Sequence, residues 1–173
     1  MTTPKTPRGL SSRITKIRSQ LSASKKEYGF IDDGGGVRYH LFYLYFLLGD
    51  NRRSSEYIRW YEKEFPDDIG ETIQTFCWAL ILHQMGKNKD AEYRLADTML
   101  SNIYLIPYLL GNPVEKAGMW HSSNYEDPDI VEYFLNQIRD AITNEDSECG
   151  LLKNIILTDS RRSWNDILLL IMN

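Results

Sequence analysis

The stretch richest in side chains that could do chemistry is WHSSNYEDPD, residues 120–129. In nucleophilic catalysis a histidine takes the proton of a nearby hydroxyl, and His121 stands directly before Ser122. Adjacent residues rarely present the geometry that this proton transfer needs, and no glycine elbow surrounds the serine. We therefore predict no catalytic residue in this stretch and expect the protein not to be an enzyme.

The same stretch also contains side chains that bind metals, since His121 is followed by Glu126, Asp127 and Asp129. The chain has only 3 histidines, however, and it contains neither an HExxH motif nor paired glutamate–histidine motifs. We expect no metal and no cofactor. A metal-dependent enzyme that uses residues 120–129 is the least favoured of the alternatives kept below.

A second candidate is the glycine run in IDDGGG, residues 31–36, because glycine-rich loops can cradle phosphate groups. Such loops follow a strand and end in a lysine that is followed by serine or threonine, and neither feature is present here. Three glycines free the backbone and disfavour helix. The run therefore predicts a break between two helices.

Composition and charge exclude several function classes. The 173 residues include 20 Lys and Arg against 24 Asp and Glu, and residues 1–28 hold seven of the basic residues with one acid. The remaining residues, 29–173, carry a net charge of about −10. This argues against nucleic acid as a ligand, because phosphate contacts need clustered Lys and Arg.

No apolar run approaches the roughly 18–20 residues of a membrane helix, so we expect no membrane partner. Without a signal-peptide core or a CxxC motif, we expect reduced thiols and a cytoplasmic location.

The elements that would position any site are helices. Apolar residues spaced by four, three and four predict an amphipathic helix over 10–27. Its apolar stripe packs on the body of the protein or docks on a partner. The basic character of this segment also fits an organelle transit peptide, which is a less favoured alternative. The segment 37–49 is apolar on nearly all sides, which predicts burial, and Gly49 would end its helix. A further helix leads to Pro66, so that residues 36–66 form a helical hairpin.

A second hairpin is predicted over 70–102. Gly86 follows Gly49 by 37 residues, and DNRRSSEY after the first glycine is echoed by KNKDAEY after the second. A degenerate unit over 103–111 and C-terminal helices in 128–173 complete the expected all-α class. We expect residues 1–9 to be a disordered tail and 10–173 to be a single domain, with the apolar C-terminus also compatible with a homodimer.

The two hairpins resemble the tetratricopeptide repeat family. The matching positions in the first copy are Leu41, Tyr45, Gly49 and Pro66, with Ser54 where alanine is usual, and in the second Trp78, Ala79, Leu82, Gly86, Ala91 and Leu95. No proline closes the second copy, and the period of 37 exceeds the usual one of about 34. The longer run from EKEFPDDIG to WHSSNYEDPD also resembles a small, uncharacterised bacterial family of repeat proteins.

The resemblance implies a short superhelix with capping helices, whose first helices line a groove that binds another protein or peptide. The groove candidates are Tyr39, Tyr43, Phe46, Phe76, Leu80 and His83, with Trp120, His121 and Tyr125 from the later loop. The alternative is that these aromatics are core residues between helices. An acidic rim would favour a basic partner, and an immunity protein or antitoxin that neutralises a toxin is the alternative function.

Overall fold

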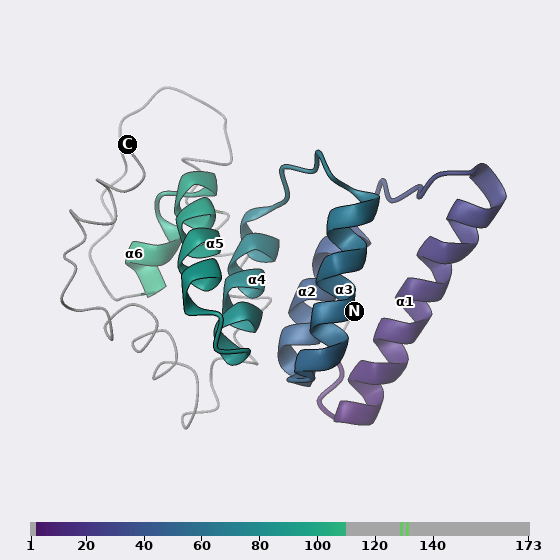
Figure 1. The fold of residues 1–173 in the computed structure, drawn as a ribbon, viewed down its shortest axis with the longest axis horizontal. Coiled ribbons are helices and arrows are strands. Elements are labelled where there is room, and N and C mark those ends of the chain that lie inside the picture. The colour runs from purple at the N-terminus through teal and green to yellow at the C-terminus, as the bar shows by residue number, and fades with distance from the viewer. Residues whose placement is uncertain (1–2, 110–128, 130, 132–173) are drawn as a thin grey trace. The chain divides into compact units, whose positions relative to one another are not determined.

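The computed structural model describes residues 3–109, 129 and 131. These residues form six helices and no strand: α1 (Pro7–Tyr28), α2 (Val37–Leu48), α3 (Asn51–Glu64), α4 (Thr72–Gln84), α5 (Asn88–Ser101) and α6 (Leu105–Leu109) (Figure 1). The all-α class is thereby confirmed for the described residues, while the tetratricopeptide-like superhelix stays a prediction. None of the helices described is long and apolar enough to cross a membrane.

The chain divides into two compact units, Met1–Lys87 and Asn88–Asn173. We call them unit 1, which holds α1 to α4, and unit 2, which holds α5 and α6. The division falls between the two helices of the hairpin predicted over 70–102, and not between the two predicted hairpins. The C-terminal helices predicted in 128–173 lie outside the described residues, apart from the isolated positions 129 and 131.

Helix α1 begins earlier than its apolar stripe indicates, because Thr6 caps it. The Thr6 hydroxyl accepts a hydrogen bond from the Gly9 N–H at 3.2 Å, and Pro7 occupies the first turn, where its missing N–H costs nothing. Residues 7–9 of the predicted tail are therefore helical. The helix buries the stripe expected from its spacing, which is Leu10, Ile14, Ile17 and Leu21.

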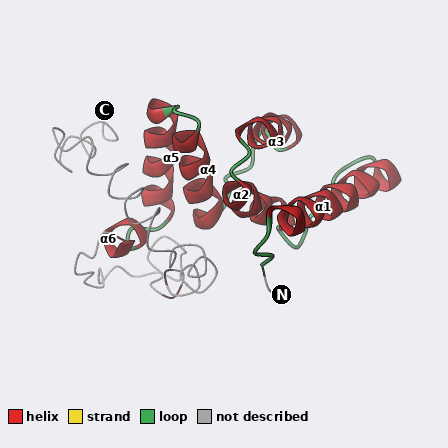
Figure 2. Cartoon of the chain, turned by 90° about the horizontal axis from the view of Figure 1, so that it is seen from below, coloured by secondary structure: helices red, strands yellow, loops and turns green. Residues whose placement is uncertain are grey.

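Helix α2 is the centre of unit 1 and packs against α1, α3 and α4 (Figures 1 and 2). Six consecutive residues are buried, which means that every side of the helix is covered: Leu41, Phe42, Tyr43, Leu44, Tyr45 and Phe46. A helix this apolar is unstable in water unless neighbours surround it. It ends at Gly49, whose positive φ of 64° lets its N–H donate back to the Tyr45 carbonyl at 3.2 Å.

Helices α3 and α4 start with side-chain caps and meet α2 through aromatic rings. The Asp50 carboxylate accepts from the Arg53 N–H at 3.0 Å, and the Gln74 side chain accepts from the Glu71 N–H at 3.2 Å. The ring of Phe42 on α2 lies about 5 Å, centroid to centroid, from three partner rings on α3 and α4: Tyr57, Tyr61 and Trp78. Such pairs contribute about 0.5–1.5 kcal/mol each beyond their buried area.

Unit 2 is described over α5 and α6. Between them the buried Asn102 side chain caps α6, because its carbonyl oxygen accepts from the N–H groups of Tyr104 at 3.0 Å and Leu105 at 3.1 Å. Helix α6 opens the segment predicted as a degenerate unit over 103–111. The buried side chains of the two helices include Ala91, Thr98, Leu105 and Ile106.

Two tyrosines of the aromatic cluster make a matched test of this core. The Tyr57 hydroxyl donates to the Arg38 carbonyl at 2.5 Å, whereas the buried Tyr61 hydroxyl lies near the Asp68 carboxylate without forming a hydrogen bond of good geometry. Tyr57→Phe should therefore cost about 1 kcal/mol of unfolding free energy, and Tyr61→Phe should cost less, because the hydroxyl that it removes makes only a poorly aligned contact with Asp68. Urea unfolding followed by tryptophan fluorescence measures both. Equal losses for the two variants would contradict this packing.

Candidate functional site

Two loops of unit 1, residues 29–36 and 65–71, lie at the same end of its helices (Figure 1). The first connects α1 to α2 and the second connects α3 to α4. We call these loops and the adjoining turns of α1 and α2 the loop end. It gathers a dense set of charged and hydrogen-bonding side chains from segments distant in sequence.

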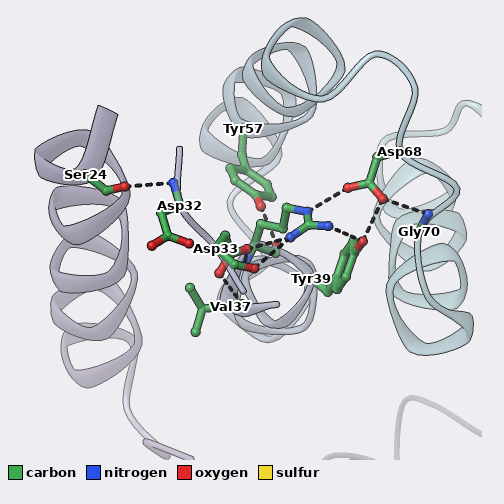
Figure 3. Close-up of polar contacts among 9 residues, drawn as sticks. Ser24, Asp32, Asp33, Val37, Tyr39, Tyr57, Asp68 and Gly70 are labelled. Atoms are coloured by element: carbon green, nitrogen blue, oxygen red, sulfur yellow. Dashed lines mark hydrogen bonds and ion pairs between the residues drawn. The ribbon is translucent and has the colours of Figure 1, made fainter. Parts of the chain in front are cut away.

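The Arg38 guanidinium ties the two loops together by pairing with Asp33 of the first and Asp68 of the second, both labelled in Figure 3. Its Nε donates to Asp68 Oδ2 at 2.6 Å, and its Nη1 donates to Asp33 Oδ2 at 3.0 Å and to the Asp33 carbonyl at 3.2 Å. Only 17% of the Arg38 side chain is exposed, with 3% for Asp33 and 11% for Asp68. Charge-assisted bonds that are largely shielded from water are stronger than bonds on an open surface.

Asp33 also starts helix α2. Its two carboxylate oxygens accept from the N–H groups of Val37 at 2.8 Å and Arg38 at 2.9 Å, which would otherwise lack partners at the helix N-terminus. Gly36, with φ of 64°, makes the turn that brings these groups together. The glycine run thus serves a helix start whose donors are already occupied by a carboxylate.

Asp68 accepts three hydrogen bonds, from Arg38, from the Tyr39 hydroxyl at 2.6 Å and from the Gly70 N–H at 3.1 Å. Desolvation alone would raise the pKa of Asp68, but these bonds outweigh it and lower the pKa below its ordinary value. Burial and the bond to Asp68 raise the pKa of Tyr39 to about 12. Neither group titrates near neutrality, so neither is suited to general acid–base catalysis there.

Aromatic rings cover the faces of the same guanidinium. The Arg38 Cζ lies 4.0 Å from the Tyr39 ring centroid and 4.9 Å from that of Phe65. The Arg38 Nη2 also donates to the Tyr39 hydroxyl, and Tyr57 holds the Arg38 carbonyl from α3. The cation–π contacts with these two rings add to the ion pairs that hold the guanidinium.

Exposed apolar side chains lie on the two loops and at the end of α1. Tyr28 is 55% exposed, Phe30 63% and Ile69 96%, and the rings of Tyr28 and Phe30 lie 6.2 Å apart. The Asp32 N–H donates to Ser24 Oγ at 2.8 Å, which ties the first loop to α1 (Figure 3). The exposed acids of the loop end and its flanking turns are Glu27, Asp32, Asp67 and Glu71. The surface therefore combines large apolar groups with negative charge.

The structure places the predicted groove residues differently from one another. Four of them lie in the core with at most 6% exposure, namely Tyr43, Phe46, Phe76 and Leu80. Tyr39 is partly exposed and belongs to the Arg38 network, and His83 is partly exposed near the far end of α4. The remaining candidates, Trp120, His121 and Tyr125, lie outside the described residues.

The structure brings together residues that the sequence did not single out, namely Arg38, Asp33 and Asp68. The carboxylate of Asp33 just before a helix start is a cap signal that could have been found. Nothing local connects Arg38 with Asp68.

Residues 3–109, 129 and 131 contain no group of three or more histidine, cysteine, aspartate or glutamate side chains placed to hold a metal ion. Burial raises the pKa of the Cys77 thiol, which disfavours its reactive thiolate form. Comparison of the chain with protein-family models, with curated proteins and with solved structures gives no match. Inference about function therefore starts from the geometry of the loop end.

The lowered pKa of Asp68 predicts a dependence of stability on pH. An acid whose folded pKa is depressed stabilises the fold at pH values above its unfolded pKa, ordinarily 3.8 here, and this contribution is lost as the pH falls through the folded value. Asp68→Asn should cost about 1–3 kcal/mol at pH 7 because it weakens the pair with Arg38.

The neighbouring Asp67 is exposed and gives a matched control. Asp67→Asn should change the unfolding free energy by less than about 0.5 kcal/mol. Urea unfolding at pH 7 and again below pH 3 should show the gap between wild type and Asp68→Asn narrowing in acid. A gap that stays constant with pH would show that the Asp68 charge contributes nothing.

Proposed function

We propose that this protein binds another protein, and that the loop end of unit 1 docks a partner segment that carries apolar and basic residues. The observation that supports the proposal most directly is the exposure of Phe30 and Ile69 on loops that a shielded ionic network holds in place. Large exposed apolar groups are costly in water and are typical of interaction sites.

The rigidity of the loops favours this function. Binding by mobile loops loses affinity because the loops must be ordered when the partner arrives. Here the bonds of Arg38 to Asp33 and Asp68 order both loops before binding. The exposed apolar groups can then act as anchors in a preformed surface.

The charge of the loop end favours a basic partner. Arg38 is matched by two carboxylates, and Lys25 is paired with Glu64. Lys26, which forms no ion pair with the described residues, offsets only one of the four exposed acids of the loop end, so the net charge there stays negative. Asp32 and Asp67 would attract lysine and arginine and would speed association at low salt. A segment with basic residues beside apolar ones fits this surface.

The acidic loop end also keeps a second function open, that of an immunity protein or antitoxin. A toxin that degrades nucleic acid carries a basic active site, since its substrate is anionic. Exposed acids beside apolar anchors would suit the mouth of such a site. In this version the partner is the toxin, and its inhibition is the readout.

A pull-down that compares wild type with variants tests whether the loop end binds the partner. The full chain is used to recover partners from its native cells at moderate salt, in parallel with the variant Phe30→Ser with Ile69→Ser. The control is Tyr93→Ser, which removes a similarly exposed ring, 65% exposed, from unit 2. Loss of both anchors should weaken partner binding by about tenfold or more, since an anchor contributes on the order of 2 kcal/mol.

Circular dichroism and urea unfolding establish that the variants remain folded. A partner retained equally by wild type and by the double variant would overturn the assignment to the loop end. Absence of any specific protein partner would overturn the proposed function itself.

The double variant Asp32→Asn and Asp67→Asn should weaken partner binding at low salt and have little effect at high salt, because salt screens the charges that steer association.

A further inference from the structure

A second feature of unit 1 runs along α1 as far as Lys26, in the turn that adjoins the loop end, and is basic in an otherwise acidic protein. An open hollow of about 580 Å³ lies along α1 and is completed by residues of α2 and α3. Three cationic side chains line it, one of them from a different helix: Arg18, Lys26 and Arg53. Hydroxyl groups of Ser19, Ser22 and Tyr45 line the same hollow.

Arg18 is held in the hollow by contacts that leave its charge uncompensated. Its Cζ lies 4.8 Å from the ring centroid of Trp60 and 5.6 Å from that of Tyr57, and its Nη1 donates to the Tyr45 hydroxyl at 3.5 Å. No carboxylate pairs with Arg18 within the part of the chain that the structure describes. The rings fix the guanidinium plane while most of its donors remain available.

Arg53 is positioned in a similar way from α3. Its Nη1 donates to Ser11 Oγ at 2.8 Å, which is a neutral acceptor. Glu56, the acid that lines the hollow, instead pairs with Arg52 at 2.7 Å. Over residues 3–109, no acid forms an ion pair with Arg53 or Lys26, in contrast to Arg38, Arg52 and Lys25.

We infer that this hollow binds a phosphate group, presented by a small phosphorylated compound or by a lipid headgroup. The guanidinium groups of Arg18 and Arg53 can neutralise a dianion, and their many donors suit its three terminal oxygens. Lys26 lies about two turns beyond Arg18 on α1 and attracts the anion at longer range. The hydroxyls of Ser19 and Ser22, which lie three residues apart on one face of α1, can supply further hydrogen bonds. A single basic hollow on an acidic body does not follow a nucleic-acid backbone, which needs an extended stripe of positive charge.

Neighbouring arginines on α3 provide the test. Full-length wild type is titrated with inorganic phosphate, against chloride at matched ionic strength, and two-dimensional NMR follows the Trp60 indole and the arginine side chains. Saturable shifts are expected for wild type and for Arg52→Gln, whose arginine is 76% exposed and lies outside the lining. Arg53→Gln should weaken phosphate binding by about tenfold or more.

A second variant protects the test against a folding defect. Lys26 is exposed and can be changed without loss of a buried contact, so Lys26→Gln should remain folded and bind phosphate more weakly than wild type. Lys25→Gln is its matched control, because Lys25 pairs with Glu64 and does not line the hollow. Equal weakening by all four substitutions would mean unspecific attraction and would overturn the proposal.

Vesicles distinguish the two sources of phosphate. Sedimentation is measured with phosphatidylcholine vesicles that contain or lack phosphatidic acid. Binding that requires phosphatidic acid and is lost in Lys26→Gln and Arg53→Gln assigns the site to a lipid headgroup, whereas phosphate binding without sedimentation assigns it to a soluble compound. If neither inorganic phosphate nor phosphatidic acid vesicles bind, the proposed site is overturned. Tighter binding of an oligoglutamate peptide than of phosphate would also overturn it.

Discussion

The pairing of one cation with two carboxylates in a partly dehydrated position underlies the arrangement of the loop end. Arg38 needs Asp33 and Asp68, because a charge shielded from water is costly unless it is paired. Each carboxylate belongs to a different interhelical loop. The requirement to satisfy this charge therefore fixes both loops, and with them the exposed side chains Phe30 and Ile69.

The second constraint is the apolar circumference of α2. Because Leu41 to Phe46 are all buried, the helix must have neighbours on every side, which α1, α3 and α4 supply. The same packing brings α1 beside α3, as the contacts of Arg53 with Ser11 and of Lys25 with Glu64 show. Packing of the core thus places the basic hollow as well as the loop end.

Local signals in the sequence predicted the helices well. Gly49 and Gly86 end or follow helices with positive φ, and the stripe from Leu10 to Leu21 is buried as its spacing indicated. The site was not predictable to the same extent. Periodicity shows that Tyr43 and Phe76 lie on apolar faces, but it cannot tell a groove from the interior, and they lie in the interior. The contact of Arg38 with Asp68 spans 30 residues, and no local pattern encodes it.

Native-state hydrogen exchange tests most directly whether Arg38 makes the two loops one rigid surface. The informative amides are those of Val37 and Arg38, which donate to Asp33, and of Gly70, which donates to Asp68. If the account is correct, these amides exchange only through the opening that also exposes the core of α2. Fast exchange through local fluctuations, with the α2 core still protected, would contradict it.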